Sequence, residues 1–322
     1  MRSVSILRDI VMNVQFYVGK VTMEREVKTI EDFLDESFKI QEEIELSNNG
    51  WKTTHHHGIA FRGQSNRNFE LIPAIGRGRM FSVDISIMNQ ERNLIEMAKY
   101  KLPNIFKPNL SPIDLLSLLQ HYGIPTRLLD VTSNPLVALY FASLDDKEDG
   151  EVFAFEYNDS DRTNYPVVNA IAETYKFAFG TFESLSLFFR DVIEQPYFAE
   201  QKSQFLNESD KYGGKWIKEC CEDLIFVHAT EQIERQKLQQ GFYILFPNEI
   251  ESYGDDYCFN KVIKPIDKDN KQIKARSIIK KERKCEILKK LEFLGISEAT
   301  LFADNIDIVC KNIVDQCKKI RY

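Results

Sequence analysis

One segment, residues 111–144, constrains the fold more than any other part of the chain, because it predicts a helix, a turn, a strand and a second helix in succession. Ser111-Pro112 is a typical helix start, since serine caps the first turn and proline suits the first helical position. Gly123 ends this helix, because glycine adopts the left-handed conformation at low cost. A buried strand is predicted at 126–131 and an almost wholly apolar helix at 136–144. This succession favours a mixed fold over a helical bundle.

Helix-like and strand-like patterns alternate irregularly along the rest of the chain. Further helices are predicted at 25–46, 85–101, 230–239, 280–294 and 304–318. Further strands are predicted at 57–63, 151–157, 223–228 and 241–246. The segment 158–214 shows no clear periodicity, and we interpret it as an insertion. Together these elements predict an α+β fold with a mixed, mainly antiparallel central sheet, or sheets, flanked by helices.

The composition is that of an ordinary globular protein. Of the 322 residues, 43% are apolar and 28% are charged, a balance that supports a sizeable buried core. No apolar run approaches the roughly 18 residues of a membrane-spanning helix, and the N-terminus shows no signal peptide. We therefore expect a cytoplasmic protein that does not bind a membrane. The net charge of −7 argues against general nucleic-acid binding, which normally requires a basic surface.

The cysteines and histidines predict no metal site. All six cysteines lie in the last third of the chain and none belongs to a C-x-x-C pair, whereas metal sites usually need ligands about two to four residues apart. Reduced thiols are therefore expected, as is usual in the cytosol. His55-His56-His57 is interpreted as a loop feature, because adjacent side chains on a strand point to opposite faces.

A short motif, Phe61-Arg62-Gly63-Gln64, places an arginine beside a glycine at the predicted end of a strand. The guanidinium group of arginine offers a planar fork of N–H donors that suits phosphate or carboxylate. A glycine beside it lets a ligand approach the backbone closely. Taken alone, such a motif is more often explained by a structural ion pair.

A second cluster of polar residues follows where a helix end, a tight turn, a strand and a loop meet. Its members are Gln120, His121, Tyr122, Thr126, Arg127, Asp130, Thr132, Ser133 and Asn134. Apolar segments on either side anchor the cluster in the core, and polar groups held rigidly at element ends are typical of binding sites. The alternative is structural: Arg127 and Asp130 form a buried pair, and His121 caps its helix.

With both motifs in view, the chain resembles the FRG family, which is named for its Phe/Trp-Arg-Gly motif. The most specific part of the resemblance is the run Gln-His-Tyr-Gly-x-Pro-Thr-Arg-Leu-Leu-Asp at 120–130. Further resemblance lies at 61–64, 71–77 and 235–242. On this basis we divide the chain into a helical lead-in at 1–50 and an FRG domain at 51–322, which carries the insertion and the C-terminal helices.

The resemblance also implies a chemistry, because the order of the polar residues is similar to that of ADP-ribosyltransferases. In that arrangement an Arg or His holds the dinucleotide, a Ser or Thr supports it, and a Glu or Gln orients the nicotinamide ribose. The corresponding positions here are Arg62, Thr132 and Gln240. A glutamine can stabilise an oxocarbenium-like ribose through its carbonyl dipole, but it cannot take a proton as a carboxylate does.

Two hypotheses follow for the function of this nucleotide site. The first is a bacterial defence or toxin effector that binds NAD or a related nucleotide as an ADP-ribosyltransferase or NAD glycohydrolase. Its catalytic residues would be Arg62, His121, Thr132 and Gln240. The second is a noncatalytic module that senses a nucleotide or another anionic ligand. In both, NAD is a candidate ligand or substrate, and the predicted ligand-binding residues are Gly63, Gln64, Arg77, Gln120, Tyr122, Thr126, Arg127, Asp130, Asn134 and Arg235.

A third hypothesis is a nuclease. In that reading His121, Asp130 and Glu156 would supply a base and metal ligands. The acidic net charge counts against it, since nucleases have to approach a polyanion.

Overall fold

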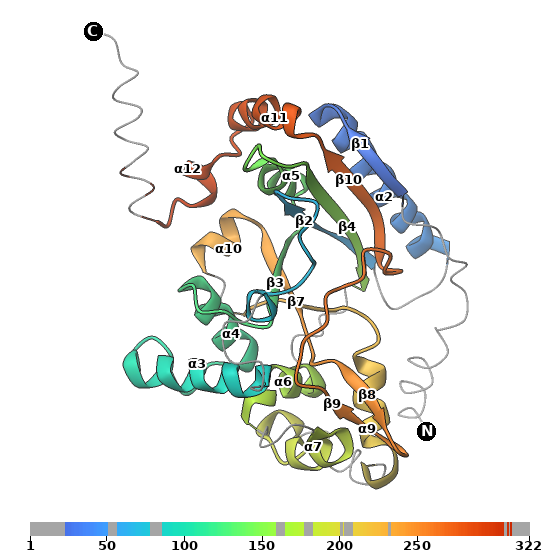
Figure 1. Ribbon diagram of the computed structural model, residues 1–322, viewed down its shortest axis with the longest axis vertical. Helices are drawn as coiled ribbons and strands as arrows, with labels where there is room; N and C mark the ends of the chain where they lie inside the picture. The colour runs from blue at the N-terminus through green and yellow to red at the C-terminus, as the bar shows by residue number, and fades with distance from the viewer. Residues whose placement is uncertain are drawn as a thin grey trace.

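A seven-stranded sheet runs through the middle of the molecule in the computed structural model (Figure 1). The structure describes residues 23–50, 57–77, 86–158, 165–176, 183–199, 202, 209–230, 233–305, 308 and 310. In sheet order the strands are β1 (Met23–Val27), β10 (Ile273–Ile279), β4 (Gly150–Asn158), β2 (His57–Gln64), β3 (Leu128–Thr132), β7 (Gly241–Leu245) and β6 (Ile225–Val227). Every neighbouring pair is antiparallel except β1 and β10, which run parallel. The predicted α+β class with a mainly antiparallel central sheet is confirmed.

Three helices cover one face of the β1–β10–β4–β2 half of the sheet. They are α2 (Ile30–Gly50), α5 (Pro135–Ser143) and α11 (Lys281–Phe293). Phe61 and Val152 point into the core beneath these helices, whereas the preceding Ala60 and the following Phe153 belong to the core on the opposite face. This alternation follows from the two-residue repeat of a strand.

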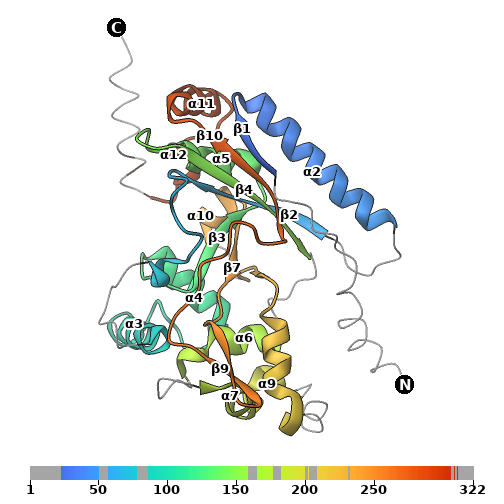
Figure 2. The same ribbon diagram turned by 45° about the vertical axis from the view of Figure 1, so that its right-hand side comes forward.

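A second group of helices packs below the β3–β7–β6 half of the sheet, around a small antiparallel sheet (Figures 1 and 2). The helices are α3 (Ile87–Lys101), α4 (Pro112–His121), α6 (Pro166–Ala172), α7 (Leu185–Val192) and α9 (Ser209–Cys220). The small sheet has the order β5 (Glu183–Ser184), β9 (Asp256–Phe259) and β8 (Ile250–Tyr253). The short elements are α10 (Glu234–Leu238), α12 (Glu298–Leu301), η1 (Ala74–Gly76), η2 (Thr174–Lys176) and η3 (Pro196–Phe198). The described part of the predicted insertion is thus mainly helical, and its strand β5 pairs with β9 from later in the chain.

Helix α5 lies directly on the backbone of β2 and β4, and two glycines make this possible. A Cβ atom added at Gly63 would lie 1.8 Å from the carbonyl oxygen of Ala138, and one at Gly150 would lie 2.0 Å from that of Ala142. Gly63 therefore lets a helix approach the strand, which is a structural role that the sequence interpretation did not include. The close contact fixes β2 and its arginine relative to α5.

The local signals of the central segment are confirmed. The hydroxyl of Ser111 accepts a hydrogen bond from the backbone N–H of Asp114, and Gly123 has a φ of +77°. Asn134 caps α5 by accepting hydrogen bonds from two backbone N–H groups through its side-chain oxygen. These contacts set the ends of α4 and α5 that border the site described below.

The sequence interpretation was wrong about several element boundaries. The helix expected at 25–46 begins only at Ile30, because 25–27 belong to β1. The helix expected at 230–239 is reduced to the short α10, and no strand was expected at β1, β5, β8, β9 or β10. The expected helix at 304–318 lies almost wholly outside the described residues, as do His55 and His56.

Two further sequence expectations can be compared with the structure. None of the helices that the structure describes is both long and apolar enough to cross a membrane. The five cysteines within the described ranges are all free thiols.

Candidate functional site

The central sheet opens between β2 and β3. Strand β2 pairs with β4 along all of its eight residues, but it pairs with β3 at only one position, Phe61 with Thr132. Beyond that position Arg62 lies in the opening, and its Nη1 donates a hydrogen bond of 2.5 Å to the carbonyl oxygen of Asp130. A side chain therefore bridges the two strands where backbone pairing stops.

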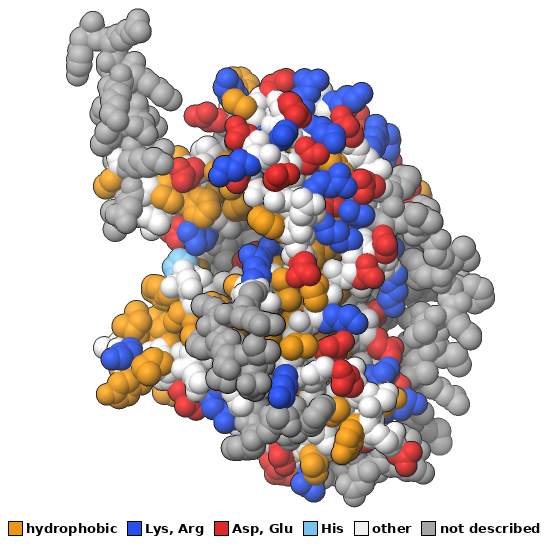
Figure 3. Space-filling model, viewed as in Figure 1, with side chains coloured by type: hydrophobic (Ala, Val, Ile, Leu, Met, Phe, Trp, Pro, Cys, Tyr) orange, Lys and Arg blue, Asp and Glu red, His pale blue; other side chains and the backbone are white. Residues whose placement is uncertain are grey.

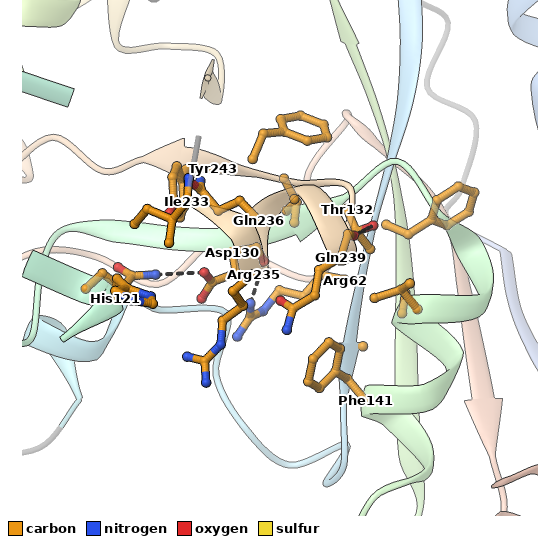
Figure 4. A pocket seen from close by; sticks show the side chains of 18 of the residues that line it. Arg62, His121, Asp130, Thr132, Phe141, Ile233, Arg235, Gln236, Gln239 and Tyr243 are labelled. Atoms are coloured by element: carbon orange, nitrogen blue, oxygen red, sulfur yellow. Dashed lines mark hydrogen bonds between the residues drawn. The ribbon is translucent and has the colours of Figure 1, made fainter. Parts of the chain in front are cut away.

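A cavity of about 320 Å³ lies at this opening, and we call it the first cavity (Figure 4). Its walls come from β2, the end of α4, β3, α5, α10, the start of β7 and the segment after α12. The polar side chains that line it include Arg62, Gln120, His121, Asp130, Thr132, Arg235, Gln236, Gln239 and Tyr243. In the space-filling view, Lys and Arg side chains lie beside a hollow at the level of α10, with hydrophobic side chains below it over α3 (Figure 3).

Three N–H donors around the first cavity lack an acceptor. Arg62 Nε, Arg235 Nε and Gln236 Nε2 are buried and have no hydrogen-bond partner among the described residues. Buried donors are nearly always paired, and leaving one unpaired costs about 1–3 kcal/mol. Three such donors around one cavity therefore indicate that an acceptor-rich group belongs there.

The side chains carrying these donors are held in place by other contacts. The guanidinium carbon of Arg235 lies 4.6 Å from the ring centre of Phe302. The Oε1 atom of Gln236 accepts hydrogen bonds from the backbone N–H of Ile233 and from the hydroxyl of Ser117. The donors are therefore oriented before any ligand arrives.

The charge of Arg62 is poorly compensated. Burial lowers the pKa of Arg62 to about 10; the nearby Asp130 opposes this shift, and the positive charge of Arg77 adds to it. Arg62 still carries its charge at neutral pH, since a pKa of about 10 lies well above 7. An anion in the cavity would offset the cost of burying this charge.

Gln120 and Thr126 position Asp130 and do not reach across the cavity themselves. Thr126 donates its hydroxyl proton to Gln120 Oε1 at 2.6 Å, and Gln120 Nε2 donates to the carboxylate of Asp130 at 2.8 Å. His121 lines the cavity beside them, with its ring 5.0 Å from that of Tyr122. Tyr122 itself packs against Phe106 and does not line the cavity.

Arg127 lies away from the cavity in a saturated structural contact. Its side chain is fully buried, and its Nε and Nη2 donate to the carboxylate of Glu91 on α3 at 2.6–3.0 Å. The remaining donors reach the carbonyl oxygen of Phe246 and the side chain of Asn248. The Arg127–Asp130 pair considered from the sequence does not form, because Glu91 takes the place of Asp130.

Of the two predicted residues Thr132 and Gln240, only Thr132 lines the first cavity. Thr132 lines the first cavity, and its hydroxyl donates to the carbonyl oxygen of Gln239 and accepts from the backbone N–H of Asn134. Gln240 is exposed, has a φ of +48° and does not line the cavity. Gln239 lines it instead, and its side chain also donates to the carbonyl oxygen of Leu301. The glutamine that lines the cavity is thus the residue immediately before the predicted Gln240.

Comparison with protein families identifies the segment that carries the predicted motifs. The model of the FRG domain matches residues 57–151. The chain carries an FRG domain. No curated protein and no solved structure matches the chain. The matched residues include Arg62 and Asp130, whereas Arg235 and Gln236 come from later in the chain.

A second cavity, of about 500 Å³, lies next to the first and shares Arg62, Gly63 and Phe141 with it. Its other lining residues are Gln64, Ser65, Phe69, Glu70, Ile72, Arg77 and Leu144. The predicted site residues of the motif at 61–64 are Arg62, Gly63 and Gln64, and each lines at least one of the two adjoining cavities. Arg77 lines the second.

Sequence reasoning missed several residues that line the first cavity. Gln239 lies three residues after Gln236 and four after the predicted Arg235, and side chains at these two spacings are neighbours on a helical turn. That spacing was a usable signal. No sequence signal marks Phe141 and Phe302, because only the tertiary fold brings them together, with ring centres 6.2 Å apart.

Proposed function

We propose that the first cavity binds the anionic part of a small molecule, with NAD or a related nucleotide as the first candidates. The observation that carries this proposal is the set of three unpartnered donors, Arg62 Nε, Arg235 Nε and Gln236 Nε2. Phosphate oxygens are acceptors only, and arginine pairs with them through charge-assisted hydrogen bonds. The volume of about 320 Å³ is suited to a ligand group of this size.

Binding is better supported than catalysis. Asp130 is the carboxylate that lines the first cavity among the described residues, and one of its oxygens already accepts from Gln120. Gln240, the candidate for orienting a ribose, does not line the cavity. The proposal therefore takes nucleotide binding as the function, and ADP-ribosyl transfer or NAD hydrolysis as an activity that has to be measured.

No observation favours the nuclease hypothesis. Glu156 lies in ion pairs with His57 and Lys274 and does not line either cavity. Within the described ranges, no group of three His, Cys, Asp or Glu side chains could hold a metal ion. The nuclease hypothesis is therefore not part of the proposal.

The test is a thermal-shift and calorimetric titration with NAD, ADP-ribose, ADP and inorganic pyrophosphate. A ligand that binds only the folded protein raises its melting temperature. Arg62→Met and Arg235→Met should each weaken binding about 10- to 100-fold, since a hydrogen bond to a charged group contributes about 1.5–3 kcal/mol. Arg190→Met is the matched control, because the side chain of Arg190 is 70% exposed and does not line either cavity.

The same samples separate a binding module from an enzyme. Release of nicotinamide from NAD, dependent on Arg62, would establish catalysis and support a cytoplasmic defence or toxin effector. Binding with unchanged NAD would establish the sensing module. The proposal fails if none of these ligands stabilises the protein, or if both cavity variants bind as tightly as Arg190→Met.

A further inference from the structure

The second cavity contains an unpartnered acceptor, in contrast to the donors of the first. Gln64 lines this cavity and is 5% exposed. Its Nε2 donates to the carbonyl oxygen of Glu70 at 3.3 Å, which fixes the orientation of the amide group. Its Oε1 is buried and has no hydrogen-bond partner among the described residues. A carbonyl oxygen left in this state requires an N–H or O–H group from a ligand.

Tertiary contacts hold the turn that follows Gln64 at the end of β2. Lys284, which is fully buried on α11, donates to the carbonyl oxygens of Ser65 and Asp145 at 2.6 Å each. The backbone N–H of Arg67 donates to the carbonyl oxygen of Asp149 at 2.8 Å. The acceptor of Gln64 is therefore held in place by tertiary contacts, and its position does not depend on a flexible loop.

Donors and apolar walls surround this acceptor. Arg77 lines the cavity and donates through Nε to the carbonyl oxygen of Ile72 at 3.0 Å. Arg62 reaches the same cavity from β2. Phe69, Ile72, Phe141 and Leu144 supply apolar surface. One acceptor beside an arginine, between apolar walls, suits a flat polar ring and not a bare anion.

We propose that the second cavity is a subsite for a planar ring that carries an amino group. The amino group donates to Gln64 Oε1, and a ring nitrogen or carbonyl oxygen beside it accepts from Arg77. Adenine and a ring carboxamide both present this donor–acceptor pair. Because the two cavities share Arg62, Gly63 and Phe141, one molecule can place its anionic group in the first and its ring in the second. The inference rests on the proposed function, since it assigns the other end of the same ligand.

The first arm of the test compares ADP with inosine diphosphate, in which a carbonyl oxygen replaces the amino group of the purine. That oxygen would face Gln64 Oε1, so the wild-type protein should bind ADP at least about tenfold more tightly. Gln64→Met, which keeps the size of the side chain but has no acceptor, should lose most of this preference. The second arm compares NAD with its deamidated form, in which a carboxylate replaces the carboxamide. A preference for NAD that disappears in Gln64→Met would place the carboxamide in the second cavity, whereas a preference confined to ADP would place adenine there.

Controls separate the subsite from the proposed function. Gln41→Met, on α2 and away from both cavities, should keep the wild-type preferences. Inorganic pyrophosphate should bind Gln64→Met as it binds the wild type, because it occupies the first cavity only. Equal binding of both members of each pair by the wild type, or a preference that is undiminished in Gln64→Met, overturns the subsite but not the proposed anion binding in the first cavity. If the wild-type protein binds neither pyrophosphate nor any nucleotide, both the proposed function and the subsite are wrong.

Discussion

Two arginines of the FRG domain lie at neighbouring strands and have opposite surroundings. Arg127, immediately before β3, is fully buried, and its three guanidinium nitrogens all donate to protein oxygens. Arg62 on β2 has one hydrogen bond, to a backbone carbonyl oxygen, and a buried Nε without a partner. The residue type is the same, so the difference lies in what the fold supplies around it. A saturated arginine joins parts of the structure, whereas an unsaturated one at a cavity is available to a ligand.

The source of the difference is the placement of the carboxylates. Glu91 on α3 faces Arg127 and provides a two-point contact. The negative charge of Asp130 acts on Arg62, but the carboxylate of Asp130 accepts from Gln120, and Arg62 donates to the backbone oxygen of Asp130.

Breaking the saturated contact should have the largest effect on stability. Arg127→Met leaves the carboxylate of Glu91 buried without its partner, so we expect the free energy of unfolding to fall by about 3–5 kcal/mol. Urea unfolding followed by circular dichroism measures this loss. Adding Glu91→Leu should recover much of it, because a buried ion pair can be replaced by apolar groups at little cost. A loss below about 1 kcal/mol would show that Arg127 is not the structural member of the comparison.

Glu156, near the end of β4, extends the comparison to a buried carboxylate whose charge can be removed by lowering the pH. Burial raises its pKa, but hydrogen bonds and charges from His57 and Lys274 outweigh this and lower the pKa from 4.5 to about 2. A carboxyl group with a depressed pKa stabilises the fold above its unfolded value and loses that contribution as the pH falls. Relative to Glu156→Gln, the wild type should therefore lose about 3 kcal/mol between pH 4.5 and pH 2.

The measurement for Glu156 is urea unfolding of both proteins at pH 7, 4.5 and 3.5. The difference between them should be smaller at pH 3.5 than at pH 4.5. A difference that does not depend on pH across this range would mean that Glu156 is not held ionised by its two partners.

Gly63 tests whether the arginine on β2 depends on the packing of α5. Gly63→Ala would place a methyl group 1.8 Å from the carbonyl oxygen of Ala138, so α5 has to move, at a cost of about 1–3 kcal/mol. Gly123→Ala is the matched control, because its Cβ would meet open space and only its φ of +77° is unfavourable, which costs about 1 kcal/mol. Gly63→Ala should also weaken ligand binding in the first cavity, whereas Gly123→Ala should not. Equal effects of the two variants on binding would contradict this account.

The sequence predicted the parts of the fold whose signals are local. The cap at Ser111, the stop at Gly123 and the cap at Asn134 act within a few residues, so α4 and α5 could be placed before the structure was known. Strand β1 could not be predicted, because its sequence is largely charged and its place depends on pairing with β10, about 250 residues later in the chain. Pairing over such a distance leaves no local pattern.

The same distinction applies to the candidate site. Arg62 could be selected from its motif, because a fork of donors beside a glycine is a chemical signal in the sequence. The partner of Arg127 could not be found in this way, because Glu91 is one of many acids on helices and only the packing of α3 brings it to β3. The sequence shows which residues can bind an anion, and the fold decides which of them remain free to do so.

The smallest predicted effect has the opposite sign from that of Arg127. Burial lowers the pKa of Arg62 to about 10, so the fold disfavours the charged form that this side chain carries at neutral pH. Arg62→Met removes the buried charge and should raise the free energy of unfolding without ligand by up to about 1 kcal/mol, as expected where function is maintained at the expense of stability. The same variant should lose the stabilisation by nucleotide. Urea unfolding with and without ligand measures both effects, and a loss of several kcal/mol without ligand would show that Arg62, like Arg127, holds the structure together.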